Sequence, residues 1–129
     1  MNELEKILAE FENTERLTVQ PNEDKAELVI NSFENWGTDD KHRCFALHGM
    51  FLRDLQKDQE KYADIFDILL WVHSYAKLIQ ADALGDEDEI LTYTNDYYLN
   101  RAALLETLKN NVKLFEYMQR KRDRRGNIG

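Results

Sequence analysis

Arg43 and His48 are the pair of side chains in this sequence best suited to chemistry on a phosphate ester. An arginine guanidinium can hold two phosphate oxygens, and a histidine can transfer protons near neutral pH. Cys44 and His48 are four residues apart, so on a helix both could bind a metal, with His73 as a third ligand. The alternative is that Cys44 is a small buried apolar residue and His48 packs at the edge of the core. Two such residues at helical spacing are common by chance, so no metal site is expected.

The stretch Arg43-Cys44-Phe45-Ala46-Leu47-His48 resembles the Arg-x4–6-His motif of HEPN ribonucleases, which are small all-α proteins. In that family the arginine and the histidine flank the scissile phosphate of RNA, usually across a dimer. The resemblance covers two residues and the fold class, and it implies that Arg43 and His48 would be catalytic. It departs from the family at Cys44, where a polar residue is usual, and in the position of the motif in the first half of the chain. In the alternative interpretation, Arg43 is a solvated helix residue and His48 a packed one.

Other motifs that indicate enzymes are absent from the sequence. It has no Gly-Lys-Thr or Gly-Lys-Ser phosphate loop and no Cys-x-x-Cys pair. It also lacks His-Glu-x-x-His and the Glu-x-x-His motif of di-iron helical bundles. We therefore expect a non-enzymatic protein without a cofactor.

Charge is distributed very unevenly along the chain. The whole protein has a formal charge of -8, but residues 1–119 hold 24 acids against 12 bases, a charge of -12. The last ten residues contain five bases: Arg120, Lys121, Arg122, Arg124 and Arg125. An acidic body attracts basic protein surfaces and repels nucleic acid, whereas the tail could contact phosphates or an acidic partner. The alternative for the tail is a last helical turn whose cations complement the helix dipole.

Length and composition indicate one domain in a reducing compartment. A chain of 129 residues suits a single domain, which we place at 1–121, followed by a basic and flexible tail at 122–129. The single cysteine, Cys44, excludes an internal disulfide, and the acidic start of the chain does not resemble a signal peptide. The most apolar stretch, 65–72, is too short to cross a bilayer. We expect a cytoplasmic protein that does not bind membranes.

Sparse glycine, a single proline and apolar residues at helical spacing predict an all-α bundle of about five helices. Asn22 and Thr38 are expected to cap the second and third helices, and Gly85 to end the fourth. The helix at 61–84 is the most apolar and is expected to be central. The predicted ranges are 2–12, 22–36, a third helix after residue 38 that ends before a turn at 56–60, 61–84, and a long C-terminal helix at 87–121 with a possible break near 94–96.

The long C-terminal helix has an apolar stripe that is expected to pack. Its members are Ile90, Leu91, Tyr97, Tyr98, Ala102, Leu104, Leu105, Leu108, Val112, Phe115 and Met118. A dimer could form through part of this stripe, at Leu104, Leu108, Val112 and Phe115.

A candidate partner-binding surface lies at the start of this helix. Tyrosine offers apolar area with a polar tip and is common at interfaces, although at least one tyrosine here is expected to pack at the edge of the core. The predicted contact residues are Asp86, Glu87, Asp88, Glu89, Tyr93, Asp96 and Tyr97.

Together these features favour a small acidic module that binds another protein with a basic surface. An inhibitor, an immunity factor or an accessory subunit of a nucleic-acid-processing machine would fit. The alternatives are an HEPN-like ribonuclease that uses Arg43 and His48, and a nucleic-acid binder that acts through the basic tail.

Overall fold

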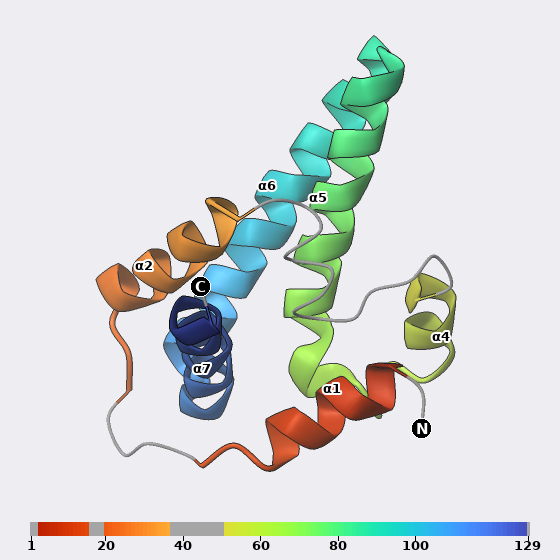
Figure 1. The fold of residues 1–129 in the computed structure, drawn as a ribbon. Helices are drawn as coiled ribbons and strands as arrows, with labels where there is room; N and C mark the ends of the chain where they lie inside the picture. Colours follow the sequence, from red (N-terminus) through yellow and green to blue (C-terminus); the bar gives the residue numbers. More distant parts are fainter. Residues whose placement is uncertain (1–2, 16–19, 37–50, 129) are drawn as a thin grey trace.

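The fold is entirely helical in the part of the chain that the structure describes. This structure is a computed structural model, and it describes residues 3–15, 20–36 and 51–128. Over these residues it contains α helices and one short 3-10 helix but no strand, which confirms the predicted all-α class (Figure 1). The elements are α1 (Glu3–Glu12), α2 (Glu23–Glu34), α4 (Phe51–Lys57), a 3-10 helix η1 (Ala63–Ile65), α5 (Phe66–Leu84), α6 (Glu87–Asn110) and α7 (Val112–Ile128).

Local chemistry sets several helix ends as the sequence predicts. The Asn22 side chain caps α2 by accepting a hydrogen bond of 2.9 Å from the backbone N–H of Lys25. Gly85 follows α5 with a φ of 72°, a left-handed conformation that glycine adopts without steric cost. Asp86 then caps α6, since its carboxylate accepts a 3.1 Å hydrogen bond from the N–H of Glu89.

Other boundaries differ from the prediction. The segment predicted as one helix from residue 61 begins with a turn and η1, and α5 starts at Phe66. The predicted break near 94–96 is wrong, because α6 runs through these residues and the chain breaks at Asn111. Asn111 has an extended backbone, and its side-chain oxygen accepts a 3.0 Å hydrogen bond from the N–H of Leu114 in the first turn of α7. A helix beginning after Thr38 was also predicted, and its start lies outside the described residues.

The core forms where the first half of α5 meets α2, α6 and η1. Trp71 and Phe33 are the largest completely buried side chains, and their rings meet edge to face at 6.3 Å between centroids. Helices α1 and α7 close another side of the core through the edge-to-face pair Phe11 and Tyr117. The apolar helix predicted to be central is thus in the core over its first half.

The stripe considered for a dimer lies inside the chain. Leu104 and Leu108 are completely buried, and Val112 and Phe115 are at most 7% exposed. These four side chains complete the core of one chain, so they are not available to pair with a second copy.

The second half of α5 and the first half of α6 form a helical hairpin that projects from the rest of the molecule (Figure 1). After Ser74, the buried residue on α5 is Ala81, and no residue of α6 before Tyr97 is buried. The projecting part is therefore held mainly by contacts between its own two helices. Residues 79–99 are called the hairpin end below.

Candidate partner-binding surface

The hairpin end is strongly acidic. Residues 79–99 contain six acids and no lysine or arginine. Asp86 and the three acids of the first turn of α6, Glu87 to Glu89, are all exposed. Negative charge is stabilising at a helix N-terminus because the helix dipole is positive there. The fold therefore tolerates this run of carboxylates while presenting it to solvent.

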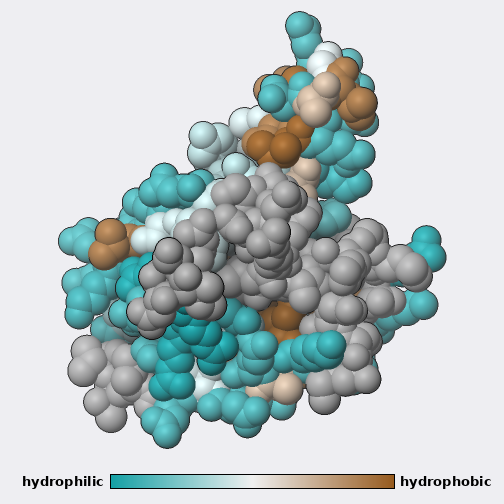
Figure 2. Space-filling view, viewed as in Figure 1, coloured by the Kyte–Doolittle hydropathy of each residue, from teal (hydrophilic) through white to brown (hydrophobic). Residues whose placement is uncertain are grey.

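Large apolar side chains are exposed on the same hairpin. Among the described residues, six large hydrophobic side chains are exposed, and five of them lie on the hairpin end: Ile79, Leu84, Leu91, Tyr98 and Leu99. The space-filling view shows apolar surface gathered on the projecting part, next to hydrophilic surface (Figure 2). Single exposed leucines are ordinary, but several together on one projection are typical of an interaction site.

The outward face of α6 explains how these side chains come together. Leu91 and Tyr98 are seven residues apart, which is close to two full turns, so they lie one above the other on the helix. Leu99 is adjacent to Tyr98, and the three side chains are 63–68% exposed. The apolar stripe predicted for this helix to pack is thus wrong at Leu91, Tyr98 and Ala102, which are exposed.

The predicted contact residues divide into two groups. Asp86 to Glu89 and Asp96 are exposed, and Tyr93 is half-buried, so these six residues remain accessible on the hairpin. Tyr97 is only 6% exposed, and its hydroxyl donates a hydrogen bond to the Glu34 carboxylate of α2. Tyr97 therefore belongs to the core, and its neighbour Tyr98 is the tyrosine that faces solvent.

Sequence reasoning missed Tyr98, Leu99, Leu84 and Ile79 as surface residues. The seven-residue spacing from Leu91 places Tyr98 on the same helix face, but it does not show whether that face is covered. The choice between Tyr97 and Tyr98 as the inward residue depends on where α2 packs, which spacing along α6 does not reveal.

A polar network fixes the base of the hairpin to α2. The Arg101 guanidinium donates to Glu27 Oε1 at 2.9 Å, to Asn31 Oδ1 at 2.8 Å and to Glu34 Oε1 at 3.0 Å. The hydrogen bond that Arg101 donates to Glu27 raises the pKa of Arg101 most, followed by those donated to Glu34 and by the charges of both carboxylates, while burial acts in the opposite direction. Arg101 therefore stays charged and joins α6 to α2.

Tyr97 belongs to the same network. Its pKa is raised well above the ordinary value, first because burial disfavours the charged phenolate and second because the neutral hydroxyl donates to Glu34. Its ring lies 5.6 Å from that of Tyr75 and 6.4 Å from that of Trp71. Tyr97 thus ties α6 to both α5 and α2 at the base of the hairpin end.

The basic C-terminal segment is part of α7, which continues to Ile128 beyond the predicted helix end at residue 121. Several of its cations already have acidic partners within the chain. Lys121 forms an ion pair with Glu10 of α1, Arg120 pairs with Glu116 at 3.0 Å, and Arg122 lies 3.4 Å from Asp123. Arg124 is exposed, and the side chain of Arg125 lies outside the described residues.

Of the four residues in the enzyme and metal hypotheses, only His73 can be placed, and it is half-buried on α5. Arg43, Cys44 and His48 lie outside the described residues. Within the described ranges 3–15, 20–36 and 51–128, no group of three or more His, Cys, Asp or Glu side chains could hold a metal ion.

Comparison with known proteins gave no relationship from which a role could be transferred. No protein-family model matches the chain, and no similar protein was found among curated proteins or solved structures. Over the described residues, every helix is too short or too polar to span a bilayer.

Proposed function

We propose that this protein is a binding module that docks the hairpin end onto another protein. The observation that carries the proposal is the coincidence of two properties on one projection: six carboxylates without a cation, and five exposed large apolar side chains. Apolar residues supply most of the binding free energy of an interface, and charged residues around them supply orientation and selectivity.

The partner surface that complements the hairpin end is an apolar groove with lysine and arginine at its rim. A negatively charged projection would be attracted to such a surface before contact, which raises the association rate. Nucleic-acid-processing proteins carry basic surfaces of this kind, and an inhibitor or accessory subunit would use the hairpin end to occupy one. The net charge of -12 on residues 1–119 supports a protein partner over a nucleic-acid partner.

The proposal is tested by affinity capture from host lysate treated with nuclease. The wild-type chain is compared with the double variant Leu91→Ser/Tyr98→Ser, and captured proteins are quantified by mass spectrometry. The matched control is Leu28→Ser, because Leu28 is an equally exposed leucine (61%, against 65% for Leu91) that lies on α2. We expect a stoichiometric partner with the wild type and with the control, and its loss with the double variant.

The contribution of charge is tested by a second pair of variants. Glu87→Lys/Asp88→Lys reverses two acids in the first turn of α6, and Glu23→Lys/Asp24→Lys makes the same change in the first turn of α2. Both pairs lose favourable interactions with a helix dipole, so their effects on folding should be similar. Loss of the partner with only the α6 pair supports the proposal. Equal capture by all variants, or capture abolished by nuclease, would contradict it.

A further inference from the structure

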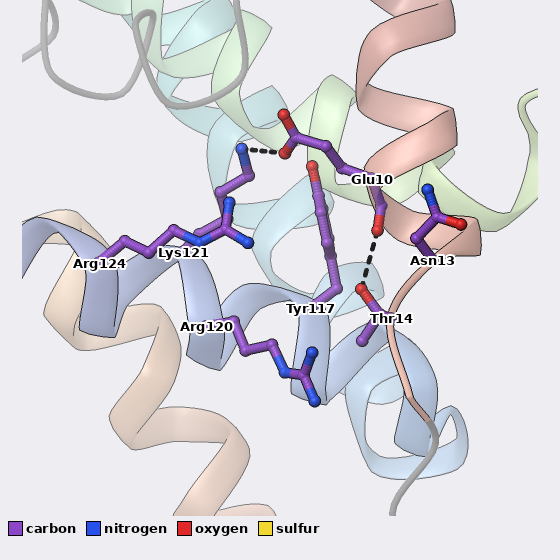
Figure 3. A pocket seen from close by; sticks show the side chains of 7 residues that line it. All are labelled: Glu10, Asn13, Thr14, Tyr117, Arg120, Lys121 and Arg124. Carbon is purple, nitrogen blue, oxygen red and sulfur yellow. Dashed lines mark hydrogen bonds and ion pairs between the residues drawn. The ribbon is translucent and has the colours of Figure 1, made fainter.

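A pocket lies between the end of α1 and one face of α7 (Figure 3). Both helices lie away from the projecting hairpin (Figure 1). Its volume is about 240 Å³, enough for a small ligand with several heavy atoms. Glu10, Asn13 and Thr14 line it from α1 and the turn that follows. The Thr14 hydroxyl donates a 2.9 Å hydrogen bond to the Glu10 carbonyl, which fixes this turn. Tyr117, which is 2% exposed, lines the pocket from α7.

Three cations complete the lining, all from the same face of α7. Arg120, Lys121 and Arg124 follow Tyr117 at spacings of three, four and seven residues, so their side chains leave the helix on one side. Figure 3 shows these side chains extending from α7, with Glu10 and Thr14 facing them. Against these three positive charges the lining contains one carboxylate, that of Glu10, and Glu116 pairs with Arg120 at 3.0 Å from beside the lining, which leaves a local charge of +1 in an acidic protein.

The three cations differ in the partners that they already have within the chain. Lys121 is held by Glu10, and its Nζ also lies 5.6 Å from the centroid of the Tyr117 ring. Arg120 donates to Glu116 through Nε, so its terminal nitrogens remain as donors. Arg124 is exposed, and no ion pair is seen for it among the described residues. The pocket therefore offers two guanidinium groups, which suit planar, bidentate recognition of a phosphate.

We infer that this pocket binds a small phosphate-bearing anion, with Arg120 and Arg124 as its principal ligands. A phosphate monoester carries close to two negative charges near neutral pH and is attracted by the excess of positive charge in the pocket. Glu10 opposes binding by its charge and by its hold on Lys121.

A small ligand fits the charge distribution better than a nucleic acid does. Charges are screened beyond roughly 8 Å at physiological ionic strength, so a compact anion in the pocket interacts chiefly with the lining. A polynucleotide would extend from the pocket over a body whose residues 1–119 carry a charge of -12. That surface would repel its remaining phosphates.

The inference is tested by titrating the full-length protein with three probes at constant ionic strength: inorganic phosphate, glycerol 3-phosphate and a single-stranded oligonucleotide. Binding is followed by calorimetry and by ³¹P NMR. We expect one saturable site for glycerol 3-phosphate. Weaker binding of inorganic phosphate would show that the organic part of the ligand is also recognised, and equal binding would show that the phosphate group alone is.

Substitutions in the pocket lining distinguish a ligand-binding site from charged residues that only stabilise the fold. Loss of one charged hydrogen-bond donor should weaken binding by about tenfold or more, so Arg124→Gln and Arg120→Gln should each have this effect. The matched control Arg53→Gln removes an exposed arginine on α4 and should leave the affinity unchanged. Glu10→Gln should instead tighten binding severalfold, because it removes the opposing carboxylate and releases Lys121.

A purely structural role for these residues would not make Glu10→Gln a tighter binder. Absence of saturable binding, equal weakening in the Arg53→Gln control, or weaker binding in Glu10→Gln would overturn the inference. Tighter binding of the oligonucleotide than of glycerol 3-phosphate, abolished by Arg124→Gln, would also overturn it and would identify a nucleic-acid contact instead.

Discussion

Replacing Arg101 should destabilise the fold more than any ordinary surface ion-pair substitution. Arg101 has a side chain that is 17% exposed, and it is paired with Glu27 and Glu34, which are 37% and 26% exposed. Exposed ion pairs contribute about 0–1 kcal/mol, whereas breaking a fully buried pair costs about 3–5 kcal/mol. Because the Arg101 network lies between these limits, Arg101→Met should lower the free energy of unfolding by about 2–3 kcal/mol.

The decrease in the free energy of unfolding of Arg101→Met is measured by urea titration at pH 7, with circular dichroism as the signal. For a chain of this length it corresponds to a decrease in melting temperature of roughly 6–12 °C. The matched control is Lys109→Met, which removes an exposed ion pair with Glu106 on the same helix. The control should lose less than about 0.5 kcal/mol, because such surface pairs contribute little.

A double-mutant cycle with Glu34→Gln isolates the interaction between α6 and α2. The coupling energy between Arg101 and Glu34 should be about 1–2 kcal/mol, since the two side chains share two hydrogen bonds in one network. If Arg101→Met were no more costly than Lys109→Met, or if the coupling energy were near zero, the network would not hold the base of the hairpin.

Three further predictions concern single positions. Below pH 10 the Tyr97 hydroxyl is neutral in both the folded and the unfolded chain. Above pH 10 it loses its proton in the unfolded chain but keeps it in the folded chain, so the free energy of unfolding should fall by about 1.4 kcal/mol per pH unit. Urea unfolding at a series of pH values should show this decrease in the wild type and not in Tyr97→Phe. Gly85→Ala should lower the free energy of unfolding in urea by about 1 kcal/mol, because φ is 72° at this position and alanine adopts that conformation poorly. Gly85→Asn should lower it by less, since asparagine tolerates this conformation better. An equal loss in the two variants would exclude backbone strain as the cause. Asn111→Ala should cost about 1 kcal/mol by removing the cap of α7, whereas Asn111→Asp should retain the cap and most of the stability.

The features that the sequence allowed us to predict are those with local causes. Asn22 caps a helix through a residue three positions away, and Gly85 ends one through its own backbone. Such interactions involve a few neighbouring residues, so composition and spacing are enough to predict them. The all-α class follows in the same way from helical periodicity along most of the chain.

The features that we failed to predict depend on residues far apart in the sequence. Tyr97 and Tyr98 are adjacent and chemically identical, and what turns Tyr97 inward is Glu34, which is 63 residues away. The polar stretch at 94–96 suggested a break, yet it stays helical in a hairpin whose two helices support each other. The break at Asn111 instead lets α7 turn back onto α1 and α2, a tertiary requirement with no strong local signal.

For the candidate surface, too, sequence reasoning identified the exposed acids, which have a local cause, but not the exposed apolar residues. The run from Asp86 to Glu89 was identifiable because acids at a helix start are exposed and favourable there. The exposed apolar residues Leu91 and Tyr98 were assigned to a packed stripe, because a helical pattern shows that residues share a face but not what covers that face. The pocket between α1 and α7 depends on Glu10 and Lys121, which are over a hundred residues apart.

The projecting hairpin also implies that not every part of this molecule unfolds in one cooperative step. Its outer turns bury Ala81 but no large side chain, so they can open while the core around Trp71 stays folded. Backbone amides of residues 87–93 should therefore exchange with deuterium through local openings, at a free energy well below that of global unfolding. Amides near Leu69 and Leu104 should exchange only when the whole domain unfolds. A bound partner would be recognised by slowed exchange restricted to the hairpin end.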